Sequence, residues 1–273
     1  MEYVDFVNSK RGGRIHLLFP GWKKGERVGF FSPHDDDALL GAGYLILGTI
    51  RSGGVPSVFV FCRGDAGYST LIEKKGMAER RKKEAIGAYG RLGIKKRDIR
   101  FFDIPDFSLM AHLDRRPPWG RGVFDPIISR LRQERISRLV FSSGHLEHWD
   151  HTAVFYAGIY TSPQAQDPIL ADLGSPRPIG TYLAYSVWGD FEPAPAGQAT
   201  RADLGILAAE EDEKLVIEAI IEFFSQDRII KNIVAHRKKR KTQGGYLELY
   251  KSIKLRQPID YSPYFGRLSK IKK

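Results

Sequence analysis

Two short segments of the chain contain residue types that suit metal chemistry. The first is His34 followed by Asp35, Asp36 and Asp37. Three adjacent carboxylates repel one another and resist the loss of water, so a nearby cation would stabilise them. Imidazole and carboxylate together form a ligand set that suits zinc. This segment therefore predicts half of a metal site.

The second segment contains three of the chain's seven histidines, at His145, His148 and His151. Residues three apart share a helical face, although a loop is also compatible with this spacing. Both segments follow apolar runs that read as buried strands, at 28–31 and 138–143. Ligands bind at the carboxyl ends of parallel strands, so we expect the two segments to meet at one ion. His145 is either a further ligand or a residue of the rim.

The two segments resemble the signatures of a known enzyme family. Residues 34–37 are similar to the His-Pro-Asp-Asp motif of the LmbE-like (PIG-L) zinc de-N-acetylases, and residues 148–151 to their His-Pro-Asp-His motif. Weaker matches lie at 63–67 and 81–94, and the resemblance covers about 27–190. Asp35, Ala38 and Trp149 replace the usual Pro, Glu and Pro, which puts the substrate in question.

The resemblance implies one Zn²⁺ cofactor, with other divalent transition metals as alternatives. It assigns the metal ligands to His34, Asp37 and His151. A catalytic zinc keeps one position open for water, and that water becomes a nucleophile near neutral pH.

The resemblance also implies the catalytic groups. Asp36 is expected to act as the general base, and His148 to stabilise the oxyanion and protonate the departing amine. Asp150 is expected to orient His148 or a ligand. Arg81 and Asp35 are the expected substrate-binding residues.

Simpler structural interpretations remain open for each segment. Asp37 suits the N-cap of the helix that follows it, which would explain one carboxylate without a metal. The pair His148 and His151 is also compatible with a surface turn. Arg81 has the spacing of a helix-surface ion pair with Glu84.

Composition is that of a globular enzyme. Among the 273 residues, 42% are hydrophobic and 27% are charged, which is ordinary for such proteins. The single cysteine, Cys62, excludes an intramolecular disulfide and a Cys-rich zinc site, and we expect it to be a small buried apolar residue. The sequence shows neither a secretory leader nor an apolar run long enough to span a bilayer, so we expect a cytoplasmic protein.

The net charge is +11 and the isoelectric point is about 9.6. Basic runs at 236–241 and 270–273 supply much of this excess, and the simplest interpretation is a solvated helix face and a frayed tail. The charge also favours an anionic substrate. Aromatic residues do not alternate with the basic run, so a nucleic-acid partner is not expected. The regions around Trp119 and 163–178 are candidate contacts for a homo-oligomer.

Apolar patterns alternate between strand and helix. We expect strands at 28–31, 57–61, 100–103, 138–141 and 179–185, and helices at 38–51, 76–92, 124–135 and 210–224. This alternation predicts βαβ units and a mostly parallel sheet. The resemblance implies an α/β fold of the Rossmann-like, three-layer, LmbE-like type. A hairpin or arm is expected at 1–27, a rim or lid at 106–122, and a loop at 192–197.

We expect one LmbE-like domain over 1–273, with its core at about 27–190 and a C-terminal extension at 191–273. The expected activity is that of a zinc-dependent amide hydrolase, a carbohydrate N-deacetylase acting on C–N bonds other than peptide bonds. Its substrate would be an N-acetylated amino sugar or glycoconjugate. The alternatives are a basic binding module without catalysis, or an amidase acting on a different N-acyl conjugate.

Overall fold

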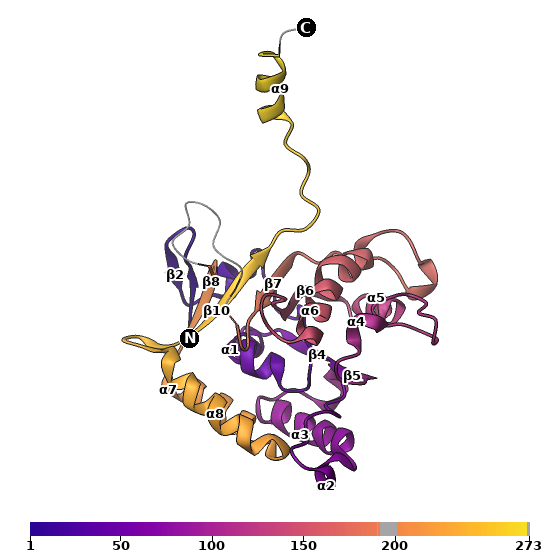
Figure 1. Ribbon diagram of the computed structural model, residues 1–273. Coiled ribbons are helices and arrows are strands. Elements are labelled where there is room, and N and C mark those ends of the chain that lie inside the picture. The colour runs from indigo at the N-terminus through magenta and orange to yellow at the C-terminus, as the bar shows by residue number, and fades with distance from the viewer. Residues whose placement is uncertain (190, 192–200, 272–273) are drawn as a thin grey trace.

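The computed structural model describes residues 1–189, 191 and 201–271, and these residues form one ten-stranded mixed sheet (Figure 1). The predicted loop at 192–197 and the last two residues of the basic tail lie outside the described residues. The strand order is β2-β1-β8-β10-β7-β6-β3-β4-β5, with β9 paired to β10. The strands are β1 (Glu2–Asp5), β2 (Lys10–Gly12), β3 (Arg27–Ser32), β4 (Val55–Cys62), β5 (Ile99–Ile104), β6 (Ile136–Ser142), β7 (Thr181–Tyr185), β8 (Leu204–Ala208), β9 (Lys241–Thr242) and β10 (Gly245–Ile253).

Helices cover both faces of this sheet (Figure 1). They are α1 (Asp37–Arg51), α2 (Leu71–Lys74), α3 (Met77–Arg91), α4 (Leu109–His112), α5 (Phe124–Gln133), α6 (Trp149–Tyr156), α7 (Glu210–Ile220), α8 (Asp227–Arg237) and α9 (Ser262–Leu268). The predicted α/β fold with a mostly parallel central sheet is confirmed. The predicted elements are present with shifted ends, and β1 with β2 forms the expected hairpin. The strands β8 and β10 and the helix α8 were not predicted.

The parallel half of the sheet places two loops at the same edge. β3 lies between β4 and β6 and pairs with both in parallel. Chain connections from β3 run outward through β4 to β5, whereas β6 and β7 lie on the opposite side. This is a topological switch point, where the loops that follow two adjacent strands leave a crevice at their carboxyl ends. The loops after β3 and β6 carry the two predicted metal-binding segments.

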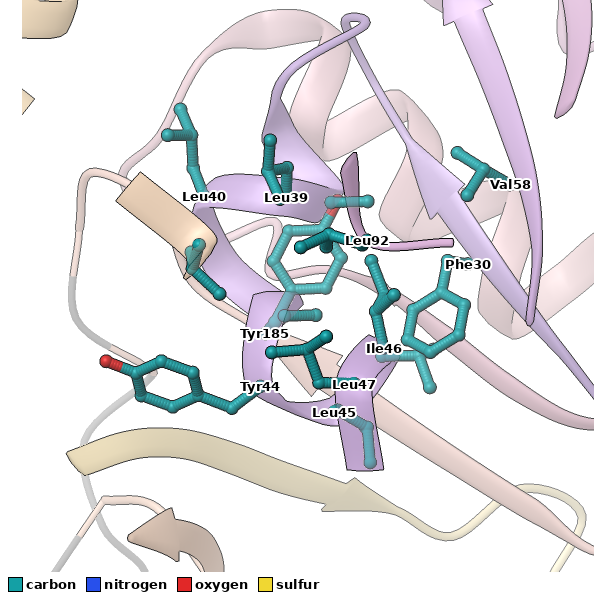
Figure 2. Close-up of a cluster of buried hydrophobic side chains, with 14 of the residues drawn as sticks. Phe30, Leu39, Leu40, Tyr44, Leu45, Ile46, Leu47, Val58, Leu92 and Tyr185 are labelled. Carbon is teal, nitrogen blue, oxygen red and sulfur yellow. The ribbon is translucent and has the colours of Figure 1, made fainter. Parts of the chain in front are cut away.

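Strands in the middle of the sheet are buried on both faces, as parallel strands usually are. In β3, Val28 and Phe30 join one apolar cluster with residues of α1, α3 and α7. Phe31 points to the other cluster, which contains residues of α5 and α6. Figure 2 shows Phe30 within the first cluster, beside Ile46 of α1. Packing against these two apolar layers fixes the direction of β3, and therefore the position of the turn at 34–37 that follows it.

Helix α1 packs against β7 without space for a side chain at one position. A Cβ atom at Gly41 would lie 2.2 Å from the ring of Tyr185. The Tyr185 hydroxyl donates a hydrogen bond of 2.8 Å to the carbonyl of Phe31 at the end of β3. This contact joins α1, β7 and β3 close to the turn that carries the predicted ligands His34 and Asp37.

Helix α1 breaks one turn after it begins. Ala42 has φ −137° and ψ 25°, which are not helical values, so backbone groups on either side lose their helical partners. The carboxylate of Glu248 in β10 accepts from the free amides of Tyr44 and Leu45, at 3.0 Å and 3.2 Å. The free carbonyl of Leu40 accepts from two arginines of the C-terminal extension.

These two arginines belong to a buried ionic network under α1. Arg237, at the end of α8, donates to Leu40 at 3.2 Å and pairs with Glu213 of α7 at 2.5 Å. Arg240 donates to the same carbonyl at 3.0 Å. The hydroxyl of Tyr44 donates to Glu213, and in Figure 2 this ring points away from the apolar side chains. The expected solvated face at 236–241 is therefore wrong for these two arginines, because the break in α1 needs donors there.

The C-terminal helix α9 stands away from the body of the protein (Figure 1). Its apolar side chains Tyr264, Phe265 and Leu268 are exposed. Among the described residues, none of the helices combines the length and apolar character required to cross a bilayer.

We predict that replacing Glu248 by Ala lowers the free energy of unfolding by about 3 kcal/mol, because a buried ionic network loses one partner and two buried amides lose their acceptor. Urea denaturation measures this change. Replacing the exposed Glu218 of α7 by Ala is the control and should change stability by less than about 0.5 kcal/mol. Equal stabilities of the two variants would show that Glu248 does not support the break in α1.

Candidate metal centre

The loops after β3 and β6 bring their imidazole and carboxylate groups together. Ligand atoms of His34, Asp37 and His151 lie within 4.8 Å of one another. His34 lies in the turn after β3, Asp37 is the first residue of α1, and His151 is in the first turn of α6. The distance of more than a hundred residues along the sequence is closed by the parallel pairing of β3 with β6.

One carboxylate oxygen lies at the centre of this group. Asp37 Oδ2 is 3.1 Å from Nδ1 of His34 and 3.1 Å from Nε2 of His151. It also accepts a hydrogen bond of 2.7 Å from the backbone amide of His34. Asp36 is the N-cap residue of α1 and makes no side-chain capping bond, while Ser32 Oγ accepts from the amide of Ala38. The interpretation of Asp37 as a helix cap is therefore wrong.

A buried glutamate stands behind His151. Glu147 Oε2 lies 2.6 Å from Nδ1 of His151, and Oε1 accepts from the amides of Val187, Trp188 and Gly189. A carboxylate that binds one ring nitrogen fixes the tautomer and directs the other nitrogen toward a metal. We did not predict a role for Glu147. Glu147 lies four residues before His151, and this spacing brings side chains together on a helical turn. This spacing could have indicated the contact between the two residues.

An aspartate stands behind His34 in the same way. Asp150 is fully buried, and its Oδ2 lies 3.3 Å from Nε2 of His34. The amides of Phe107 and Leu109 donate to its two carboxylate oxygens, at 2.7 Å and 3.2 Å. Each of the two imidazoles thus has one nitrogen on a buried carboxylate and the other on Asp37. The predicted rim at 106–122 begins with the two amides that hold Asp150.

The charges of the group stabilise one another. Burial alone would raise the pKa of Asp37, yet His151 and His34 hold it well below its usual range. Burial alone would lower the pKa of His151, but the carboxylates of Asp37 and Glu147 raise it to about 9. Burial also acts to lower the pKa of His34, and hydrogen bonds to Asp150 and Asp37 raise it well above the usual value. The carboxylates therefore stabilise positive charge at this position, as a metal-binding site requires.

Asp35, Asp36 and Arg81 form a second buried group beside the first. Nε of Arg81 donates to Asp35 at 2.8 Å, and Nη2 lies 3.3 Å from Asp36 Oδ2. Arg81 and Asp35 are only 4% and 2% exposed, so their contacts are with each other. Burial raises the pKa of Asp36 to about 6, with Arg81 opposing this rise.

The structure gives Arg81 a different partner from the one that helix spacing allowed. Glu84 accepts from the amide and hydroxyl of Ser225, at 2.9 Å and 2.6 Å, so the predicted ion pair of Arg81 with Glu84 is wrong. Contact of Arg81 and Asp35 with a substrate stays a prediction that their burial does not favour. Their observed contacts position the turn that carries Asp36.

His148 lies at the open side of the group. Its ring centroid is 4.9 Å from that of His34 and 4.5 Å from that of Phe107, and its side chain is 28% exposed. Nδ1 accepts a hydrogen bond of 3.1 Å from the amide of Asp150. The proton of the neutral ring is therefore on Nε2, where it is available as a donor. Burial, together with the nearby His34, lowers the pKa of His148 and favours this neutral form.

Two other residues lie near His34. Ligand atoms of Cys62 and Asp106 lie within 4.8 Å of it, and Cys62 is buried as expected. Burial raises the pKa of the Cys62 thiol far above its usual range, so this thiol is a poor metal ligand. Asp106 is engaged by the amides of Gly64 and Ala66. His145 belongs to none of the potential metal-binding groups found among the described residues.

The residues present fit a divalent transition metal ion. Two imidazoles and one carboxylate converge, and a buried carboxylate supports each imidazole. Three protein ligands of these types are the pattern of a catalytic zinc site. The ligand assignment to His34, Asp37 and His151 stays a prediction, which this geometry favours over the other two groups around His34.

Comparisons with known proteins agree with this geometry. A family model described as GlcNAc-PI de-N-acetylase, or PIG-L, matches residues 30–161. Residues 30–161 belong to the PIG-L family. The matched range begins in β3 and ends just after α6, so it contains both metal-binding segments. This match supports a hydrolytic de-N-acetylase activity. A comparison with curated proteins found no match.

Solved structures with the same fold extend beyond the PIG-L match. An N,N'-diacetylchitobiose deacetylase from Pyrococcus horikoshii is 19% identical, with a TM-score of 0.64 over 86% of both chains. A teicoplanin deacetylase in a zinc-inhibited form is 17% identical, with a TM-score of 0.57 over 83% of this chain and 98% of the other. A 4-carboxy-2-hydroxymuconate hydratase from Pseudomonas putida is also 17% identical, with a TM-score of 0.63 over 86% and 99% of the chains. At these identities the likeness shows the fold alone.

We predict that replacing Glu147 by Gln weakens zinc binding about 10–100-fold, because the carboxylate that supports the His151 ring loses its charge. A titration in competition with a chelating dye measures the affinity. Replacing the exposed Glu79 of α3 by Gln removes the same charge away from the site and should leave affinity unchanged. If the Glu147 variant bound zinc with unaltered affinity, Glu147 would not act on the metal through the His151 ring.

Proposed function

We propose that the protein is a zinc-dependent hydrolase that removes the acetyl group from an N-acetylated amino sugar or glycoconjugate. The observation that carries this proposal is the placement of Asp37 between His34 and His151, each backed by a buried carboxylate. The family description is that of a de-N-acetylase, and two similar structures are named as deacetylases, one of N,N'-diacetylchitobiose and one of teicoplanin. The alternative, a basic binding module, requires an acidic cluster that merely caps a helix, whereas Asp36 at the N-cap of α1 makes no side-chain capping bond.

His34, Asp37 and His151 would hold the metal ion. A zinc ion in this position would polarise the acyl carbonyl and lower the pKa of water at its open position. Asp36 lies in the same turn as the proposed ligands His34 and Asp37. It takes the proton from the attacking water. Its own position is held by Arg81, which lies 3.3 Å away. Buried Arg81 and Asp35 thus serve the reaction by fixing the base.

His148 acts on the other side of the substrate. Because Nδ1 accepts from the amide of Asp150, the Nε2 proton is directed outward from the loop. This proton stabilises negative charge as it develops on the carbonyl oxygen. The departing amine takes the proton that Asp36 removed from the water, because the neutral His148 ring would become an imidazolate if it gave up its only N–H proton. Asp150 contributes through its backbone to His148 and through its carboxylate to His34.

The finer points of this proposal are the substrate, the metal and the cellular context. Zinc is the metal that two imidazoles and a carboxylate favour, and other divalent transition metals are alternatives. An amidase acting on a different N-acyl conjugate would use the same residues. Location in the cytoplasm and assembly into a homo-oligomer stay predictions.

We predict that the purified protein releases acetate from N-acetylglucosamine or N,N'-diacetylchitobiose, and that replacing Asp36 by Asn lowers kcat about 10²–10⁴-fold because the general base is removed. An enzyme-coupled acetate assay measures the rate. The Asn variant should retain its zinc, since Asp36 is not a ligand. Replacement of the exposed His16 by Ala is the control and should leave both rate and zinc content unchanged. Full turnover by the Asp36 variant would remove this residue from the role of base.

We also predict that 1,10-phenanthroline abolishes acetate release and that added zinc restores it at one ion per chain. Loss of zinc removes the group that activates water, whereas the fold is held by the two apolar layers. Circular dichroism checks that the fold persists. Activity that survives complete metal removal, confirmed by elemental analysis, would contradict a metal-dependent mechanism.

A further inference from the structure

Phe107, in the loop between β5 and α4, is an exposed aromatic residue beside the candidate metal centre. It is 62% exposed. The centroid of its ring lies 4.5 Å from that of His148, and the two ring planes are tilted by 55°. The His148 ring in turn lies 4.9 Å from that of His34 and 6.0 Å from that of His151. The rings thus form a series that runs from the proposed metal ligands through His148 to the exposed Phe107.

The backbone of Phe107 has a conformation that its residue type disfavours. Its φ is 64°, which lies in the left-handed region. A bulky side chain is strained there, whereas glycine, asparagine and aspartate are accepted more readily. A lone exposed phenylalanine is ordinary at a protein surface, but one that is held in a strained conformation beside a reactive centre indicates a use for the ring.

The residues on both sides of Phe107 hold the loop in this conformation. The carboxylate of Asp106 accepts a hydrogen bond of 2.8 Å from the amide of Gly64. The amides of Phe107 and Leu109 donate to Asp150, at 2.7 Å and 3.2 Å, and the Leu109 side chain is fully buried. Strain of this kind persists only where the surrounding contacts determine the backbone. The loop therefore presents the ring as a preorganised surface, which loses little entropy when a ligand packs on it.

The proposed reaction places the amine-bearing part of the substrate at this ring. The amide to be cleaved would lie between the metal ion and His148. An acetyl group ends one carbon beyond the carbonyl, so the part of the substrate that carries the nitrogen is the part large enough to extend past His148 to Phe107. In an amino sugar this part is a pyranose ring, whose axial C–H groups form an apolar face. Such a face packs well on the negative face of an aromatic ring.

We propose that Phe107 is a specificity-determining residue and that the apolar face of the sugar packs against its ring. This inference rests on the proposed function, because it assigns a contact to the substrate of the same site. The contact selects N-acetylated amino sugars over small acyclic acetamides. It contributes equally to the bound substrate and to the transition state, so it lowers the KM and leaves the chemical step to the metal ion, Asp36 and His148.

The test compares acetate release from N-acetylglucosamine with release from N-acetylethanolamine, an acetamide without a sugar ring. Replacing Phe107 by Gly removes the aromatic ring, and glycine adopts a φ of 64° without strain, so the loop should keep its conformation. We expect this variant to raise the KM for the sugar about tenfold more than the KM for N-acetylethanolamine, with little change in kcat for the sugar.

Two further variants serve as controls. Replacing Phe107 by Tyr keeps an aromatic ring and should keep the KM for the sugar. Phe265 is 65% exposed and lies in α9, which stands away from the body of the protein (Figure 1). Its replacement by Gly removes the same ring at a distance from the metal centre and should leave the KM for both substrates unchanged.

A binding measurement separates this contact from the proposed activity. In protein that carries Asp36→Asn, NMR titration with N-acetylglucosamine measures affinity with little turnover, and the added change of Phe107 to Gly should weaken binding about tenfold. Unchanged affinity and KM for the sugar would overturn the contact. Equal losses for the two substrates would also overturn it, because they would show that Phe107 only holds His148. Sugar binding that requires Phe107, without acetate release from any sugar by the unaltered protein, would instead contradict the proposed function and leave the contact standing.

Discussion

The turn between β3 and α1 buries like charges, and much of the structure serves to balance them. Asp35 and Asp37 are each 2% exposed, and ionised carboxylates in such positions need close cations. Arg81 reaches this turn from α3 and neutralises one side of it. On the other side the imidazole of His151 reaches Asp37 from α6. The charge balance therefore requires that β3, α3 and α6 keep fixed relative positions, which the sheet provides.

The C-terminal extension supports this arrangement through hydrogen bonds to the backbone of α1. Helix α1 begins with Asp37 and breaks at Ala42, so its first turn is a short unit that needs support at its end. Two arginines supply that support at the carbonyl of Leu40, and Glu248 supports the second part of the helix. A segment outside the family match thus holds the turn that carries the chemistry.

Much of the fold and the candidate site could be predicted from the sequence, for identifiable reasons. The strands β3, β4 and β6 are short apolar runs, and the alternation with helices fixes parallel pairing. Metal-competent residues at the ends of two such strands then have to meet. The strand β10 was missed because Glu248 and Lys251 interrupt its apolar pattern. Glu248 is buried all the same, because the break in α1 requires an acceptor at that point.

Partnerships between distant charged residues could not be predicted. Arg81 has Glu84 at helical spacing, yet it pairs with Asp35, 46 residues away along the chain. Arg237 lies in a basic run that reads as solvated, yet it is 2% exposed. In each case local spacing suggested a surface residue, and the decisive partner came from another element. The role of Glu147 was closer to prediction, because its partner His151 lies only four residues away.

The proposed chemistry depends on one divalent ion held jointly by the loops after β3 and β6. Anomalous diffraction at the zinc absorption edge, from crystals grown with one equivalent of zinc, tests this most directly. We predict a single strong peak within coordination distance, about 2.0–2.3 Å, of His34, Asp37 and His151. A peak held by residues of only one loop, or none at all in zinc-supplied crystals, would contradict the account.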